Sequence, residues 1–270
     1  MRVMPSGSPF AKLPGGLPPG RLIEPDEDYA DDPTWSGHDA IWVSDEQVPD
    51  VARLWRRLYA SRAETGLYPL LLEGLDGEPD RPWHVGELGP APVGTIDVLT
   101  AGGVLRRFWD AIAPDDEDEE DPFPGLPDGR WAGLADPGEG TRDPDGAALE
   151  LVEVLASVKG WLLGLVPAAR GADALTLAGW DGPCNHTNHT QEISAVLRSW
   201  EDRFGVRVVS VGFATLQVSV AAPPVTYDHA LRVAAEHHAF CPDNIWQGEG
   251  SAEEYAKGLV GADRWSFWWD

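Results

Sequence analysis

Hydrophobic residues recur along the chain at two spacings, those of helices and those of strands, and they predict elements of both kinds. In the N-terminal half, Val51, Trp55 and Leu58 fall on one face at helical spacing, together with Leu54. The elements predicted there are a strand at 40–43, a helix that opens at Ser44 with Gln47 completing a capping box and that ends at Gly66, a strand at 67–72, and a helix capped by Thr95.

The C-terminal half shows a clearer pattern. Its predicted elements are a long helix at 147–166 that Pro167 stops, a strand at 174–178, a helix at 190–204, a hairpin of 206–213 with 215–221, a helix from Thr226 to about Phe240, a short helix with the capping pair Ser251 and Glu254, and a strand at 264–269. After the long helix the order is β-α-β-β-α-α-β. This order predicts an α+β fold, in which helices pack on a mostly antiparallel sheet.

Composition divides the chain into four predicted regions. Residues 1–38 hold seven prolines without an apolar period, which predicts an irregular N-terminal arm. An N-terminal α/β region at 39–113 precedes an acidic, Pro/Gly-rich linker at 114–146 and a C-terminal α+β domain at 147–270. Every residue from Asp115 to Asp121 is acidic, and like charges repel. We therefore interpret the linker as a solvated segment, with a decoy of nucleic-acid charge as the alternative.

The net charge of −25, from 45 acidic and 20 basic residues, argues against a general nucleic-acid binder. The same repulsion argues against an anionic membrane surface. The first residues lack the apolar segment of a secretory signal, and no apolar run reaches the roughly 18 residues of a membrane span. We therefore expect a cytoplasmic protein without membrane contact, whose two cysteines, Cys184 and Cys241, are reduced thiols.

Strong catalytic motifs are missing from the sequence. It contains no glycine-rich nucleotide-binding loop, no nucleophile elbow and no H-E-x-x-H zinc motif. Polar residues instead gather in two segments, 179–190 and 236–246, where we expect a site. The candidate residues are Trp180, Asn185, His186 and His189 in the first segment, Glu236, His237, Cys241, Asp243 and Trp246 in the second, and the C-terminal Asp270. The two tryptophans are included as exposed candidates because each lies in a polar loop flanked by glycine.

The cysteines and histidines of these segments suggest two kinds of chemistry. Thiolate and imidazole ligands suit zinc, but the spacings C-x-H-x-x-H and H-x-x-x-C are not those of a structural zinc site, so neither a metal nor a cofactor is expected. A nucleophilic pair would join Cys241 to His186 or His189. Cys184 is the better placed thiol, because it lies shortly before a predicted helix start.

A structural interpretation of the same residues stays open. Buried cysteines behave as small hydrophobic residues, and histidines at a helix end complement its dipole. The carboxylates of Glu236 and Asp243 would then hold a neighbouring loop by accepting its N–H groups.

Four segments of the chain are distinctive in sequence: Gly179-Trp180 with Asn185, the run LRSWEDRFG at 197–205, the run EHHAFCPD at 236–243, and the tryptophan-rich ending WSFWWD at 265–270. Together they resemble the bacterial domain-of-unknown-function family 4253. The resemblance implies an α+β domain with its core at 165–270. It also implies a bacterial source, and the excess of arginine over lysine favours an actinobacterium. It implies no activity.

Two functions are compatible with this sequence. The missing catalytic motifs and the acidity favour a non-catalytic binding or interaction protein, immunity- or inhibitor-like, that meets a basic protein partner. The alternative is a small-ligand hydrolase or transferase with a His/Cys/Asp site between loops 179–190 and 236–246. That alternative requires a histidine of these loops to reach a second polar group. The sequence gives no oligomeric state.

Overall fold

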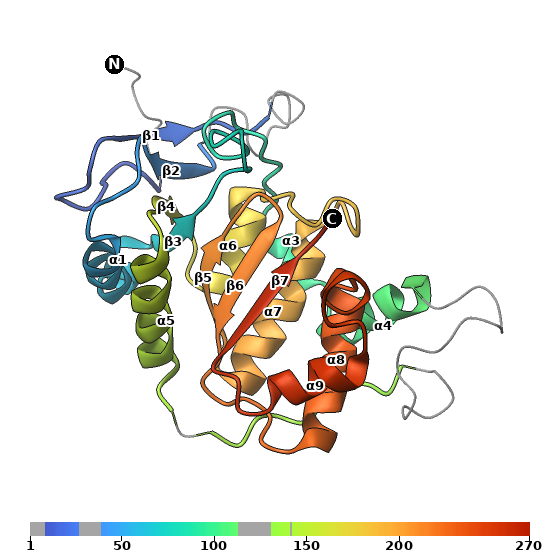
Figure 1. The fold of residues 1–270 in the computed structure, drawn as a ribbon. Helices are drawn as coiled ribbons and strands as arrows, with labels where there is room; N and C mark the ends of the chain where they lie inside the picture. The colour runs from blue at the N-terminus through green and yellow to red at the C-terminus, as the bar shows by residue number, and fades with distance from the viewer. Residues whose placement is uncertain (1–8, 27–38, 113–130, 141) are drawn as a thin grey trace.

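A seven-stranded sheet organises the part of the chain that the computed structural model describes, residues 9–26, 39–112, 131–140 and 142–270 (Figure 1). Its strands, in chain order, are β1 (Gly20–Ile23), β2 (Ile41–Ser44), β3 (Tyr68–Leu72), β4 (Leu162–Val166), β5 (Arg207–Val211), β6 (Thr215–Ser219) and β7 (Arg264–Trp268). The order across the sheet is β1-β2-β4-β3-β5-β6-β7. Only β3 and β5 pair in parallel, so the expected α+β fold with a mostly antiparallel sheet is confirmed.

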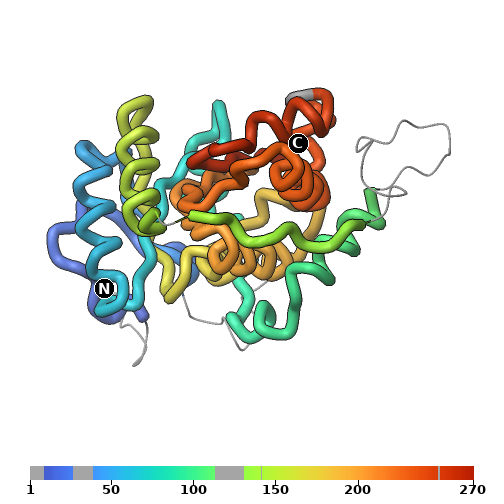
Figure 2. Tube along the Cα trace, turned by 90° about the horizontal axis from the view of Figure 1, so that it is seen from below, coloured from blue at the N-terminus to red at the C-terminus, as the bar shows by residue number. Residues whose placement is uncertain are grey.

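Helices cover both faces of this sheet. Helices α1 (Val51–Ala60) and α5 (Pro144–Val158) lie on one face, and α6 (Gly171–Ala178) and α7 (Thr190–Phe204) lie on the other (Figures 1 and 2). The remaining helices are α2 (Arg62–Thr65), α3 (Gly94–Asp97), α4 (Ala101–Ile112), α8 (Tyr227–Phe240), the π-helix η3 (Asn244–Glu249) and α9 (Ala252–Leu259). Helix α4 packs against α7 and α8.

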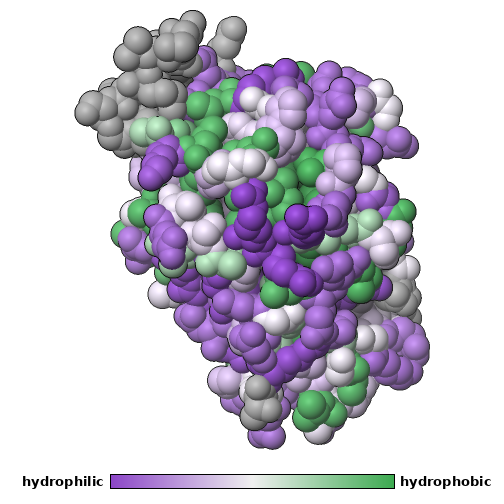
Figure 3. All heavy atoms as spheres, turned by 90° about the vertical axis from the view of Figure 1, so that its left-hand side faces the viewer, coloured by the Kyte–Doolittle hydropathy of each residue, from purple (hydrophilic) through white to green (hydrophobic). Residues whose placement is uncertain are grey.

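The side of the molecule that carries α1 and α5 is largely hydrophilic, with smaller hydrophobic areas between the polar side chains (Figure 3). Arg56 of α1 and Glu153 of α5 form an ion pair there, at 2.7 Å. An exposed pair of this kind contributes at most about 1 kcal/mol, so the packing of the buried helix faces holds these helices in place.

Aromatic side chains fill the core beneath β7. Trp200 of α7 stacks on Phe267 with ring centroids 5.4 Å apart, and it meets Trp265 and Phe240 edge-on. Trp265 and Phe267 are buried, whereas Trp268 between them and the chain end is 37% exposed. Buried and exposed side chains therefore alternate along β7, as they do in a strand with one buried face.

Two predicted elements of the C-terminal half are wrong. The helix expected at 147–166 ends at Val158, and its last part is the central strand β4. The strand expected at 174–178 belongs to helix α6, which ends at Gly179 in the left-handed conformation. Both segments are almost wholly buried, so neither has the polar face that would reveal its period.

Three details of the N-terminal half also differ from expectation. Ser44 does not cap a helix but ends β2, where its hydroxyl donates to the Glu46 carbonyl and accepts from the Leu163 amide. Helix α1 begins only at Val51. Thr95 lies inside the short helix α3, because the predicted helix is divided into α3 and α4.

The terminal arm and the linker are more ordered than expected where the structure describes them. Strand β1 lies inside the arm predicted to be irregular, and it pairs with β2 along its whole length. Residues 131–140 of the linker, which we name the strap, pack on the C-terminal domain with Ala135 only 3% exposed. The acidic run at 115–121 lies outside the described residues. Among the helices that are described, none is long and apolar enough to cross a membrane.

Candidate functional site

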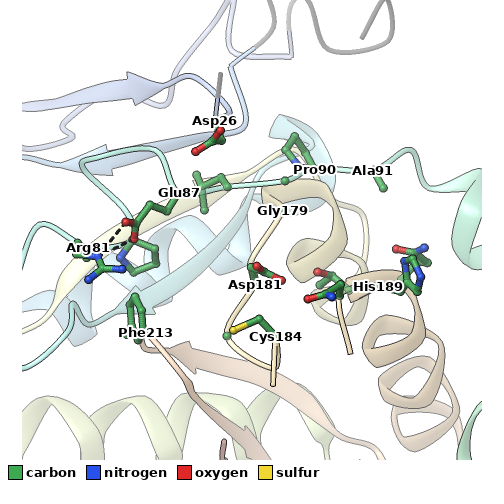
Figure 4. A pocket seen from close by; sticks show the side chains of 17 residues that line it. Asp26, Arg81, Glu87, Pro90, Ala91, Gly179, Asp181, Cys184, His189 and Phe213 are labelled. Carbon is green, nitrogen blue, oxygen red and sulfur yellow. Dashed lines mark hydrogen bonds and ion pairs between the residues drawn. The ribbon is translucent and has the colours of Figure 1, made fainter. Parts of the chain in front are cut away.

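A cavity of about 580 Å³ lies where the segment 81–91 meets the loop between α6 and α7 (Figure 4). Its lining combines apolar groups, such as Leu88 and Phe213, with many polar ones. The ionisable or nucleophilic side chains among them are Asp26, Arg81, Glu87, Asp181, Cys184 and His189. A volume of this size suits a small ligand or a side chain of a partner protein.

Backbone contacts fasten the two walls of the cavity together. The Gly89 amide donates to the Gly179 carbonyl at 2.8 Å, and the Ala91 amide donates to the Thr176 carbonyl at 3.0 Å. Gly179 has φ +74°, and a Cβ atom there would come within 2.1 Å of the Pro90 nitrogen. The close approach therefore requires glycine at this position.

The charged side chains of the cavity differ in whether they form ion pairs. Arg81 donates from Nε to both carboxylate oxygens of Glu87, at 2.9 and 3.0 Å, and its guanidinium lies 5.1 Å from the centre of the Phe213 ring. Among the described residues, the Asp181 carboxylate has no hydrogen-bond or ion-pair partner. Partial burial raises the pKa of Asp181. The Arg81–Glu87 pair is neutral overall, so Asp181 adds a negative charge to the cavity, whose lining also includes Asp26.

Of the residues predicted for the site, His189 lines this cavity, and so does Cys184. Asp181 and Cys184 lie between the Arg81–Glu87 pair and His189 in the close view (Figure 4). Cys184 is exposed and free, but no hydrogen bond joins it to His189. The two residues therefore share a cavity without forming a nucleophile–base pair.

The expectation of an exposed Trp180 is wrong. Its side chain is fully buried, and the indole N–H donates to the carbonyls of Gly212 and Phe213, at 2.8 and 3.1 Å. The flanking glycines that suggested a loop serve close packing instead, since a Cβ atom at Gly182 would lie 2.2 Å from the Trp180 ring. Trp180 thus forms the floor beneath the loop rather than a ligand contact.

The two predicted polar segments do meet, at the chain end. Asn185 donates from Nδ2 to the Asp270 carbonyl at 2.5 Å. The Asp270 amide in turn donates to Oδ2 of Asp243 at 3.2 Å. Three candidates are therefore in contact, but their bonds tie down the C-terminus.

The strongest acid–base and nucleophile candidates of the second segment are closed off from solvent. His237 has no exposed surface and shares a hydrogen bond of 3.0 Å with the Tyr255 hydroxyl, so it does reach a second polar group. Burial, with the nearby Arg203, lowers the pKa of His237 to about 3. Cys241 donates from its thiol to the Trp268 carbonyl, and burial raises the pKa of Cys241 to about 12. Neither group is poised for proton transfer or attack near pH 7.

Glu236 is engaged in the way that the structural interpretation describes. The carboxylate is fully buried and accepts from the Trp200 indole at 2.8 Å and from both terminal nitrogens of Arg203, at 2.8 and 2.6 Å. It also accepts from the Ala135 amide of the strap at 2.7 Å. Glu236 therefore holds a segment of the linker, and no open site surrounds it.

His186 and Trp246 lie elsewhere, and neither is among the residues that line the cavity. The ring of His186 packs on Phe108 with centroids 4.5 Å apart, and burial lowers the pKa of His186. Trp246 is 52% exposed, as expected, and its ring lies 5.2 Å from that of His238.

Asn244, which belongs to the second polar segment, borders the last strand. Its side-chain amide donates to the Ser266 carbonyl at 2.8 Å and accepts from the Trp268 amide at 3.4 Å. The sequence gives no signal for Arg81 and Glu87, because residues from a distant part of the chain complete the cavity only in the fold. In the part of the chain that the structure describes, no group of three or more His, Cys, Asp or Glu side chains could hold a metal ion.

Fold and cavity together define an α+β protein with a pocket that is shared between an N-terminal segment and a C-terminal domain. Residues 162–270 match the family model described as Domain of unknown function (DUF4253), which confirms the resemblance for this part of the chain. No curated protein and no solved structure matches the chain. The matched region supplies the wall at 179–191, whereas Arg81 and Glu87 come from outside it.

Proposed function

We propose that this protein is a cytoplasmic, non-catalytic binding protein whose cavity receives a cationic group of a basic partner. The observation that carries the proposal is the Asp181 carboxylate, which lines the cavity, is exposed, and has no ion-pair partner among the described residues. A guanidinium or ammonium group that entered the cavity would form a charge-assisted hydrogen bond with Asp181. The neutral Arg81–Glu87 pair and the Phe213 ring would surround its apolar stem.

The state of the catalytic candidates supports binding over catalysis. His237 and Cys241 are buried with pKa values far from neutrality, and Glu236 is fully engaged in hydrogen bonds. The net charge of −25 suits an inhibitor- or immunity-like role, because it would speed the encounter with a basic protein. Cys184 and His189 on one cavity keep a small-ligand hydrolase or transferase as the second candidate.

A charged peptide tests the binding proposal directly. We would titrate the full chain with capped hexa-arginine by calorimetry at low salt, and with hexa-citrulline, which has the same shape without the charge. Asp181→Asn is expected to weaken hexa-arginine binding up to about fivefold, because Asp181 is exposed and an ion pair there contributes at most about 1 kcal/mol. Asp228→Asn is the matched control, since Asp228 is exposed on α8 and is not part of the cavity.

Equal weakening by the two substitutions would contradict the proposal, because it would show attraction to the acidic surface as a whole. The exposed Cys184 thiol provides a second readout inside the cavity. Bound hexa-arginine should slow the reaction of Cys184 with a thiol reagent, and hexa-citrulline should not. Cys184→Ser should leave the affinity unchanged, whereas the second candidate function requires the thiol for turnover.

A further inference from the structure

The strap crosses the C-terminal domain and is held through its main chain. The Ala135 amide donates to Glu236 at 2.7 Å, and the Ala135 carbonyl accepts from Nη1 of Arg203 at 2.9 Å. Both polar groups of one residue are thus bound by a single buried ion pair. The Asp136 carbonyl accepts from Nε2 of His229 at 2.8 Å, which adds a third main-chain contact.

Two glycines bring the strap against the domain. The Gly138 amide donates to the Arg203 carbonyl at 3.0 Å. A Cβ atom at Gly138 would lie 1.7 Å from the Ala222 carbonyl oxygen, and one at Gly140 would lie 2.6 Å from the Ala222 Cβ. Side chains at these two positions are therefore excluded by the domain surface itself.

The groups that hold the strap form a built receptor. Glu236 has no exposed surface and the Arg203 side chain is 12% exposed, so the pair is arranged within the domain and not on its rim. Arg203, Ala222 and Glu236 all lie within the matched region 162–270, whereas the strap lies outside it. The matched region thus supplies the buried ion pair and the close-packed surface on which the strap, from elsewhere in the chain, lies.

We propose that the surface of α7, α8 and Ala222 on which the strap lies (the groove) is a peptide-binding site of the C-terminal domain, which the strap occupies as a tethered ligand. The partner that fits is an extended segment with a small residue at the position of Ala135 and glycines three and five residues later. Main-chain bonds to Glu236 and Arg203 provide the attachment, and the contact with Ala222 selects the glycines. The inference is independent of the cavity at Asp181.

A labelled peptide with the sequence of residues 131–140 tests this site by fluorescence anisotropy. In the full-length variant Gly138→Val, the added side chain meets the Ala222 carbonyl, so the strap should leave the groove. The peptide is expected to bind this variant at least tenfold more tightly than it binds the wild-type chain, whose groove is filled. A control peptide with valine at the position of Gly138 carries the same charge as the first peptide. It should not bind, because its valine would meet the Ala222 carbonyl.

Equal binding of the two peptides, or no binding to a variant that circular dichroism shows to be folded, would overturn the proposal. If the variant does not fold, amide hydrogen exchange of the wild-type chain tests the same proposal. The Ala135 amide should then exchange by a local opening, faster than the slowest amides of β6. Exchange of Ala135 only together with β6 would show that the strap is an inseparable part of the domain and would equally overturn the proposal.

Discussion

Substitution of Glu236 by glutamine removes one charge from the core and keeps the size of the side chain. The Arg203 guanidinium, whose side chain is 12% exposed, would then lack its anionic partner. Loss of one member of a buried ion pair costs about 3–5 kcal/mol, because the remaining charge stays desolvated. The glutamine oxygen can still accept from the Trp200 indole or the Ala135 amide, so we expect the lower end, about 3 kcal/mol, in the free energy of unfolding.

Urea unfolding followed by tryptophan fluorescence measures this difference, provided that the slope with denaturant is unchanged. Glu150→Gln is the matched control, because Glu150 pairs with Arg142 while its side chain is 67% exposed. That substitution should cost no more than about 1 kcal/mol. If Glu236→Gln were also to cost less than about 1 kcal/mol, the buried pair would not stabilise the strap and the domain as we argue.

Three further predictions concern titration, reactivity and the cavity wall. Folding lowers the pKa of His237 from 6.5 to about 3, so the unfolded chain binds the proton first and stability should decrease as the pH falls from about 6.5 towards 3. In urea titrations at pH 7 and pH 4.5, His237→Gln should lose less stability than the wild type over this interval, and an unchanged loss would contradict the assignment. A thiol reagent should modify Cys184 rapidly and Cys241 only on unfolding, so that Cys184→Ser removes the fast phase; a fast phase that persisted would show Cys241 to be accessible. Gly179→Ala should cost more than about 1 kcal/mol in thermal or urea unfolding, since it combines a positive φ with a collision at Pro90, and a neutral result would refute the close approach.

Elements marked by local chemistry were predictable from the sequence. Gly205 ends α7 in the left-handed conformation, Thr226 caps α8 and Ser251 caps α9, each as expected. These residues act on backbone groups close to them in the chain, so their effect depends little on the tertiary structure. The segment of β4 was predicted as helix and the segment of α6 as strand. Both are buried on all sides, so neither shows the alternation of apolar and polar residues that distinguishes a strand from a helix.

The site was only half predictable for a related reason. The loop at 179–190 does line the cavity at Asp181, since polar residues before a helix start rarely lie in a core. Its opposite wall, with Arg81 and Glu87, is about a hundred residues earlier in the chain and shares no motif with it. Trp180 shows the converse error, because its polar neighbours in sequence are not its neighbours in space.

The amide of Asn244 has a consequence for association between molecules. Strand β7 is the last strand of the sheet, and the outward groups of Ser266 and Trp268 would otherwise be open to a strand from another copy. Asn244 offers them a donor and an acceptor, as a neighbouring peptide unit would. An exposed edge strand is a template for aggregation, and a covered one is not. One side chain of η3 therefore occupies an acceptor and a donor of this edge that a strand from another copy would need, and it does so without a further strand.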